Sequence, residues 1–155
     1  MHAECGGPGV GVVDMCLTGN FAISLMADES VMAPVTAQPA LPFGLGRGSK
    51  AALAVAGDDL RAAAARAAAG TPLLGRRFGG DRICPPERFD TLRRAFGAAF
   101  EAVEIDSSPG NRFGVGSRAH AVLTLEFVDE EEHPTRRARD RVLGFLKERL
   151  PLQAI

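Results

Sequence analysis

The segment Gly11-Val-Val-Asp-Met-Cys-Leu-Thr-Gly19 decides the fold of this chain. Together with Val10 it begins as a nearly continuous apolar run, which is typical of a strand covered on both faces in a parallel sheet. Cys16 comes next, and the chain turns at Thr18-Gly19 into a helical pattern. A strand, a side chain that can act as a nucleophile and then a helix form the layout of a nucleophile elbow. The alternative is that Cys16 is a small buried residue at a strand end.

The elbow interpretation gives Cys16 specific neighbours. A sharp turn holds the nucleophile in a strained backbone conformation and places the N–H of the next residue, Leu17, beside it. That N–H and the start of the following helix favour a thiolate and can hold an oxyanion. Cys16 is therefore the candidate nucleophile, and Leu17 the candidate oxyanion donor.

The composition indicates an ordinary globular chain. It has 155 residues, enough for one domain over residues 1–155, with 46% hydrophobic residues, 24% charged residues and a net charge of -1. This balance gives no electrostatic reason to expect nucleic acid as a partner. No apolar run approaches the roughly 20 residues of a membrane span, and the start Met1-His2-Ala3-Glu4 does not resemble a secretory signal. Three cysteines indicate free thiols, so we expect a cytoplasmic protein.

Strands and helices are predicted to alternate along the chain. This alternation predicts an α/β fold, in which about four parallel strands carry helices on both faces. The first helix is apolar almost all round and is expected to lie in a core, and the third helical segment is expected to be capped by Asp58-Asp59. The predicted strands are Val10–Met15, Val31–Val35, Thr71–Phe78 and Phe100–Ile105, and the predicted helical segments are Asn20–Ala27, a turn within Lys50–Ala56, Asp58–Ala69, Pro85–Gly97 and Pro134–Leu150.

Three chemically matched residues follow predicted strands. Function in parallel sheets gathers at the carboxyl ends of the strands, and Cys16, Asp81 and the loop that leads to His120 all lie there. His120 can take the thiol proton, and Asp81 can fix the imidazole tautomer. The chain order nucleophile, acid, histidine is that of the α/β-hydrolases. Taken singly, Asp81 also fits a turn or cap aspartate, and His120 a structural histidine.

Five short motifs resemble the dienelactone hydrolase family of α/β-hydrolases, over nearly the whole chain. The family uses a Cys-Asp-His triad to open enol-lactones through an acyl-thioester intermediate, and the resemblance assigns these roles to Cys16, Asp81 and His120. It implies no metal and no organic cofactor. The motifs are Met15-Cys16-Leu17-Thr18-Gly19, Ala33-Pro34-Val35 with Gln38-Pro39, Gly80-Asp81, Asp106-Ser107-Ser108-Pro109-Gly110-Asn111 and Ala119-His120.

The chain departs from the family in two respects. Asp14 and Thr18 stand two residues before and after the cysteine, where small residues are usual, and a carboxylate at position 14 is expected to oppose thiolate formation. The family sheet has about eight strands, against four predicted here, so we expect a partial α/β-hydrolase fold that lacks the N-terminal strands. The family's second oxyanion donor comes from a loop after an early strand and has no counterpart. The loss of one donor typically lowers the rate about 100- to 1,000-fold, so reduced activity is expected.

A partial fold also predicts an exposed sheet edge. Val10–Met15 is expected to be bare on one side, so that the chain pairs with itself or with a partner chain. The alternative to a hydrolase that acts on a small lactone or ester is a non-catalytic remnant, a structural or interaction module. Reaction with a thiol probe separates the two, because an activated Cys16 reacts at a lower pH than an ordinary thiol.

The arginines, cysteines and histidines include further candidates for binding. Arg76, Arg77, Arg82 and Arg118 lie near predicted strand ends and are candidates to hold a substrate carboxylate. A zinc site has no support from spacing, since no Cys-x-x-Cys pair is present. The residues from which such a site could be assembled are Cys5, Cys16, Cys84, His2 and His133.

Overall fold

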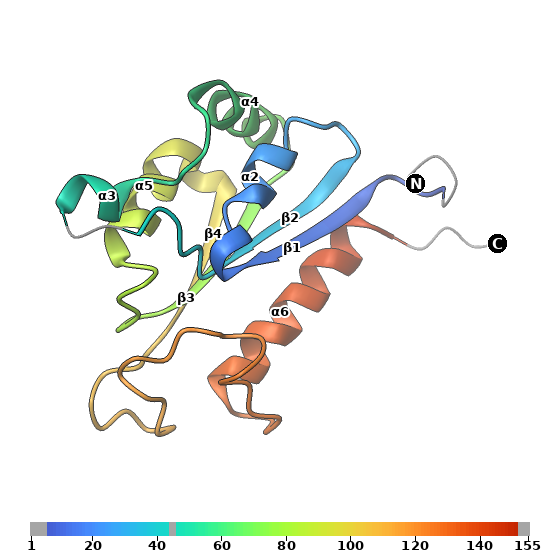
Figure 1. The fold of residues 1–155 in the computed structure, drawn as a ribbon. Coiled ribbons are helices and arrows are strands. Elements are labelled where there is room, and N and C mark those ends of the chain that lie inside the picture. Colours follow the sequence, from blue (N-terminus) through green and yellow to red (C-terminus); the bar gives the residue numbers. More distant parts are fainter. Residues whose placement is uncertain (1–5, 44–45, 152–155) are drawn as a thin grey trace.

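The computed structural model describes residues 6–43 and 46–151 (Figure 1). Its sheet consists of β1 (Val10–Met15), β2 (Val31–Ala37), β3 (Leu73–Phe78) and β4 (Phe100–Ile105). Helices and strands alternate as the sequence pattern predicts. The helical segments are the 3-10 turns η1 (Cys16–Thr18) and η2 (Gly97–Ala99) and the helices α2 (Phe21–Leu25), α3 (Arg47–Ala51), α4 (Gly57–Ala68), α5 (Pro86–Phe96) and α6 (Pro134–Arg149).

The four strands are parallel, and their order in space is β1-β2-β3-β4. This sheet confirms the predicted α/β class. Because all four strands run the same way, their carboxyl ends meet at one edge of the sheet. The segments after β1, β3 and β4 therefore leave the sheet on the same side.

Two strand boundaries differ from the prediction, both beside a proline. β2 continues to Ala37, past the predicted end at Val35. Pro34 is tolerated inside it because the pairs with β3 begin only at Val35, so its missing N–H interrupts no pair on that side. β3 begins at Leu73 rather than at Thr71, since Pro72 cannot donate to the ladder.

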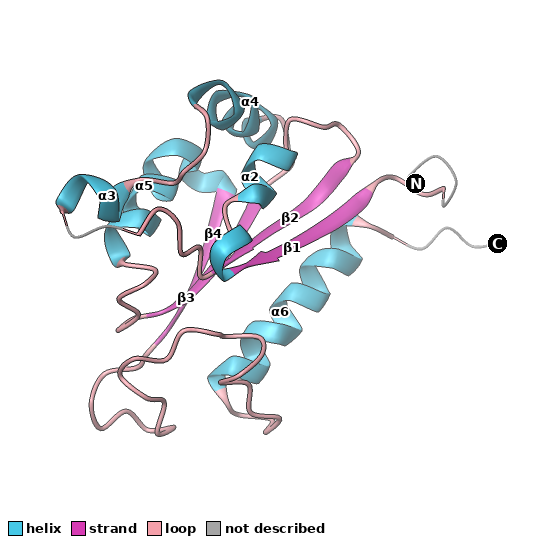
Figure 2. Ribbon diagram, in the orientation of Figure 1, coloured by secondary structure: helices cyan, strands magenta, loops and turns pink. Residues whose placement is uncertain are grey.

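Helices cover both faces of the sheet (Figure 2). α6 packs on one face, and α2, α4 and α5 pack on the other. On the second face Gly75 leaves room for the Phe100 ring, which would lie 2.5 Å from a Cβ at that position. The core under α6 contains Ala33, Val35, Leu74, Val142 and Phe145, and the core on the other face includes Ile23, Met26, Leu73, Phe89, Leu92 and Phe96.

Two predicted helix features are wrong. The N-cap of α4 is Ala56, and Asp58 and Asp59 lie within its first turn, where their charges complement the helix dipole without capping it. The helical turn predicted within Lys50–Ala56 begins and ends earlier, as α3. The Ala52 carbonyl instead accepts a hydrogen bond of 2.8 Å from Arg88 Nε, and the backbone there is extended.

The exposed edge predicted for the first strand is present in the described chain. β1 pairs with β2 on one side, and no described strand pairs with its other side. α2 was expected to be buried all round, and this is wrong: Ala22 and Ile23 are buried, but Phe21 and Leu25 are exposed. They face outward because no described element lies beyond β1. Four exposed apolar side chains along this edge are called the apolar edge patch: Val13, on the α6 face of the sheet, is 37% exposed, and Leu17, Phe21 and Leu25, in η1 and α2, are 51%, 53% and 46% exposed.

Candidate active site

Cys16 occupies a strained turn directly after β1. Met15 has an extended backbone, and Cys16 itself has a φ of 55°, a left-handed conformation that is unfavourable for any residue with a side chain. The Cys16 carbonyl accepts hydrogen bonds from the N–H groups of Gly19 at 3.1 Å and Ala40 at 2.8 Å. The second bond ties the turn to the loop that follows β2, so the strained conformation is held from two sides.

After Cys16, the turn requires a small residue at position 19 but not at position 18. A Cβ on Gly19 would lie 2.7 Å from the Cα of Pro39, so this position requires glycine. Thr18 is exposed, and its Oγ1 donates to the Met15 carbonyl at 3.1 Å. The turn therefore accepts Thr18 where the resembled family has a small residue.

Asp14, the other departure, faces α2. Burial raises the pKa of its carboxyl, and a hydrogen bond from the Ala22 N–H, in the first turn of α2, opposes this shift. One of its oxygens, Oδ2, is buried without a hydrogen-bond partner in the described chain. The effect of this carboxylate on Cys16 stays a prediction, although a raised pKa brings Asp14 closer to its neutral form.

The structure brings the three candidate residues together in one hydrogen-bonded row. His120 Nε2 lies 3.1 Å from Cys16 Sγ, and His120 Nδ1 lies 2.7 Å from Asp81 Oδ2. These residues come from the ends of β1 and β3 and from the long loop after β4. Separations of 104 and 39 residues along the chain are thereby reduced to hydrogen-bond distances.

Asp81 is fixed by its own loop. It is 2% exposed, and its Oδ1 accepts the N–H groups of Ile83 at 2.8 Å and Cys84 at 3.1 Å. These two bonds leave Oδ2 directed at His120. Gly80 must be glycine here, because a Cβ would lie 2.6 Å from the Ser117 carbonyl oxygen.

His120 is held in its protonated form by its neighbours. The hydrogen bond to Asp81 is the largest cause that raises the pKa of His120 to about 9; burial opposes the shift, and Cys16 adds to it. The imidazole therefore keeps its second proton at neutral pH, with Nε2 directed at the thiol. Because the folded pKa exceeds the usual 6.5, the associated stabilisation is present below about pH 6.5 and is lost as the pH rises through about 9.

The oxyanion role expected of Leu17 concerns its backbone N–H and stays a prediction. Leu17 follows Cys16 within η1, and its side chain is half exposed in the apolar edge patch. An N–H directly after the nucleophile is the first donor of an oxyanion hole in an elbow of this type.

The four candidate arginines separate into two pairs. Arg76 and Arg77 are buried within β3: Arg76 donates to the Ala138 carbonyl, and Arg77 donates to the Cys84 carbonyl and pairs with Glu104. Their expected role in holding a substrate is wrong, because both side chains are buried, although Nε and Nη2 of Arg76 have no hydrogen-bond partner in the described chain. Arg82 and Arg118 are exposed and line a pocket of about 770 Å³ at the ends of β3 and β4.

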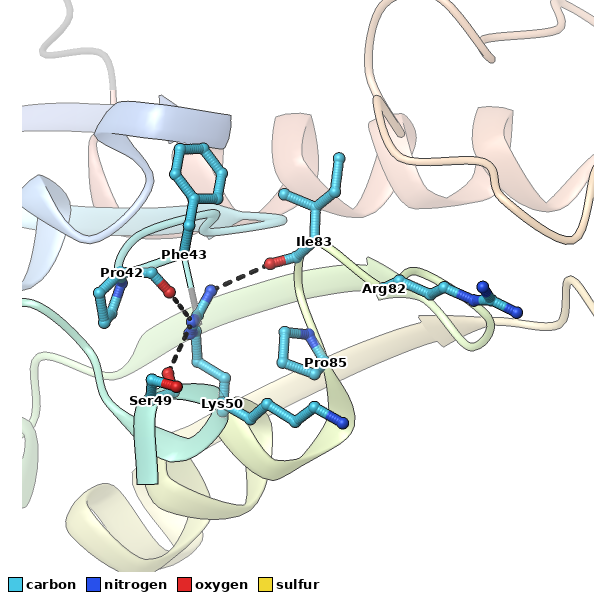
Figure 3. Close-up of a pocket in the computed structure, with 8 residues that line it drawn as sticks. Pro42, Phe43, Ser49, Lys50, Arg82, Ile83 and Pro85 are labelled. Carbon is cyan, nitrogen blue, oxygen red and sulfur yellow. Dashed lines mark hydrogen bonds between the residues drawn. The ribbon is translucent and has the colours of Figure 1, made fainter. Parts of the chain in front are cut away.

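A second pocket, of about 620 Å³, lies between the loops after β2 and β3 (Figure 3). Phe43 and Ile83 stand on one side of it, and Lys50 and Arg82 extend toward the right of the view. We call it the Lys50 pocket. A third pocket shares Lys50 and Arg82 with it and is also lined by Asp81, so this surface reaches the candidate site. The lining includes Pro42, Phe43, Lys50, Arg82, Ile83 and Pro85.

Arg88 is buried at the base of the Lys50 pocket and forms hydrogen bonds to the segments on both sides of it. Its guanidinium donates to five backbone carbonyls, three of which are drawn in Figure 3. Because carbonyls bear no net charge, they leave the positive charge of Arg88 in place under the pocket. The five acceptors belong to Pro39, Pro42, Ser49, Ala52 and Ile83.

The described part of the structure provides no support for a zinc site. No group of three or more metal-binding side chains is found within residues 6–43 and 46–151, and His2 and Cys5 lie outside the described residues. His133 is the N-cap of α6 and accepts the Thr135 N–H at 3.3 Å. Cys84 is buried, and burial is the main cause that raises the pKa of its thiol to about 12, which disfavours a metal-binding thiolate.

Comparison with known proteins does not identify a family for this chain. No protein-family model matches the chain, and a search of the curated proteins gives no significant match. Among the helices that the structure describes, none has the length and apolar character needed to cross a membrane.

Proposed function

We propose that this chain is a hydrolase of the dienelactone hydrolase type, which cleaves a lactone or carboxylic ester through Cys16, Asp81 and His120. The observation that carries the proposal is the hydrogen-bonded row from Asp81 through His120 to Cys16. The strained turn at Cys16 supports it, since unfavourable backbone conformations persist at sites where function requires them. The proposed setting is the cytoplasm, where thiols stay reduced.

The proposed reaction has two steps. The Cys16 thiolate attacks the carbonyl carbon, and the Leu17 N–H stabilises the oxyanion of the tetrahedral intermediate. When this intermediate collapses, the C–O bond breaks, His120 gives the proton at Nε2 to the departing alkoxide, and a thioester remains on Cys16. Neutral His120 then takes a proton from water as the water attacks the thioester. The acid leaves, and the thiolate–imidazolium pair is restored.

The pocket chemistry favours a substrate that bears a carboxylate. Lys50 and Arg82 supply cations beside the apolar surface of Phe43 and Ile83, and among the described residues no acidic side chain lines the Lys50 pocket itself. The carboxylates of Asp81 and Glu87 line the adjoining third pocket. Arg118 lies in the neighbouring pocket and supplies a third cation. A lactone or ester with an apolar body and one carboxylate matches this combination.

The Arg82→Gln variant tests this choice of substrate. We expect it to raise KM at least about tenfold for a carboxylated ester, because one charged hydrogen bond is worth roughly 1.5–3 kcal/mol, and to leave KM unchanged for the uncharged analogue. Arg94→Gln, which alters an exposed arginine of α5, is the matched control. An equal change of KM for both esters would contradict a carboxylate contact at Arg82.

Alkylation of Cys16 as a function of pH tests the proposed site without a substrate. Because the pKa of His120 is raised to about 9, the imidazolium is present at pH 6 and can stabilise the thiolate. We expect iodoacetamide to label the Cys16 peptide at pH 6, and His120→Ala to lower that rate at least tenfold. An ordinary thiol profile, rising near pH 8.5 in both proteins, would favour the non-catalytic module.

The exposed β1 edge supports the second candidate function, which is an interaction module. It also gives a reason to expect that another chain pairs with β1. An unpaired parallel strand presents backbone donors and acceptors, and the apolar edge patch adds side chains that water disfavours. We therefore propose that a second copy or a partner chain covers this edge.

Sedimentation velocity tests the proposed self-association. At tens of micromolar we expect a mass at least twice the 16.3 kDa of one chain. Replacing Leu17 and Phe21 together with glutamate is expected to return it to one chain, because burying two carboxylates at the edge is unfavourable. Leu125→Glu, at a residue that is 90% exposed in the loop before α6, is the control. A wild-type monomer would contradict the proposed pairing.

A further inference from the structure

Along the chain, His120 lies in the middle of a long loop. The loop that carries it runs from residue 106 to residue 133, between β4 and α6, and the helices and strands themselves do not determine where its backbone lies. A shift of about 1 Å in a reacting group can lower the rate about 100-fold, so local contacts have to fix this backbone. Part of the support is apolar. Ala119 and Val122 are buried on either side of His120, in a cluster with Phe78 and Ile105.

A carboxylate, that of Glu126, provides the polar contacts that fix the His120 backbone. Glu126 Oε1 accepts the His120 N–H at 3.3 Å, and Glu126 Oε2 accepts the Ala121 N–H at 2.7 Å. The Glu126 N–H donates in turn to the Ala121 carbonyl at 3.3 Å. The segment 120–126 is thus closed on itself by one side chain, which holds two successive backbone N–H groups at the site.

Glu126 and Asp81 act on different parts of the histidine. Asp81 contacts the ring nitrogen Nδ1 and is the largest cause of the raised pKa of His120, whereas Glu126 contacts backbone N–H groups and is not among the causes of that shift. Asp81 sets the orientation of the imidazole ring, and Glu126 sets the position of the His120 backbone, to which the side chain is attached.

We propose that Glu126 is a positioning residue for His120, which sets the loop backbone so that Nε2 reaches Cys16 Sγ at 3.1 Å. The inference rests on the proposed function, because it assigns the purpose of the contact to the Cys16–His120 pair. Charged acceptors form stronger hydrogen bonds than neutral ones, so a carboxylate is suited to hold two N–H groups in an exposed loop.

The test compares Glu126→Ala, Glu126→Gln and Glu131→Ala by the pH dependence of Cys16 alkylation, read by peptide mass spectrometry. Glu131 is an exposed carboxylate of the same loop and serves as the matched control. We expect Glu126→Ala to lower the alkylation rate at pH 6 about tenfold or more, because the imidazolium no longer faces the thiol. Glu126→Gln is expected to keep most of the rate, since its amide oxygen still accepts the Ala121 N–H.

A purely structural role would lower thermal stability and leave the pH dependence unchanged. An alkylation profile of folded Glu126→Ala equal to that of Glu131→Ala would overturn the inference. If Glu126→Ala does not fold, Glu126→Asp decides: its shorter chain reaches one of the two N–H groups, so a reduced rate at pH 6 supports the role and an unchanged rate overturns it. A wild-type protein without low-pH alkylation is a separate outcome, which would overturn the proposed function and this inference together.

Discussion

Replacing His120 with alanine is expected to lower the turnover of a chromogenic short-chain ester by about 10⁴-fold. His120 is the proton donor of the first proposed step and the proton acceptor of the second, and it lies 3.1 Å from the thiol. Without it the departing alkoxide has no acid, and water has no base. The measurement is the initial rate with purified wild-type and variant proteins at pH 7.

The chain offers a control for the loss of an imidazole. His133→Asn removes a histidine from the N-cap of α6 but keeps a side chain that can cap a helix, so its rate should stay close to that of the wild type. A His120→Ala protein that retains more than a tenth of the wild-type rate would show that the hydrolysis takes place elsewhere.

Replacing Asp81 with asparagine is expected to lower turnover by a similar factor, for a different reason. The asparagine oxygen can still accept the Ile83 and Cys84 N–H groups, so the loop should keep its shape. Its amide donates to His120 Nδ1, which favours the tautomer with the proton at Nε2 and leaves that nitrogen unable to act as a base. We therefore expect a loss of about 10⁴-fold in kcat with little change in fold.

A titration of His120 by NMR checks the same variant independently. In the wild type the pKa is about 9, with the bond to Asp81 as the largest cause. In Asp81→Asn this cause is gone and burial still favours the neutral ring, so the His120 pKa should fall to about 6.5 or below. Asp106→Asn, an exposed aspartate after β4, should leave it unchanged. An unshifted pKa in Asp81→Asn would contradict the role given to Asp81.

The parts of the fold that follow from local patterns could be predicted from the sequence. The apolar run Val10–Met15 and the alternation of helices and strands led to the four-stranded parallel sheet. The exposure of Phe21 and Leu25 was missed because an apolar helix pattern does not say whether another element covers it. Pro34 misled the prediction of the β2 boundary, because whether a missing N–H matters depends on the neighbouring strand.

In the candidate site, residues that follow strands could be predicted from the sequence, whereas residues that act through contacts within loops could not. Cys16 and Asp81 follow strands directly, and the topology brings such positions to one edge. Glu126 and Lys50 were missed because their neighbours lie in irregular segments whose path no periodicity encodes. Arg88 was also missed: Pro86 at the start of α5 predicts a helix, but nothing in the sequence indicates that one of its arginines reaches five carbonyls.

Mass spectrometry of the protein mixed rapidly with an activated ester tests the central claim most directly. The account predicts an acyl group on the peptide that carries Cys16, which decays as the acid is released and is absent from Cys16→Ala. Cys84 should stay unmodified in the same sample, because its thiol is buried and its pKa is raised to about 12. Ester turnover that persists in Cys16→Ala without any acyl group on Cys16 in the wild type would contradict the account.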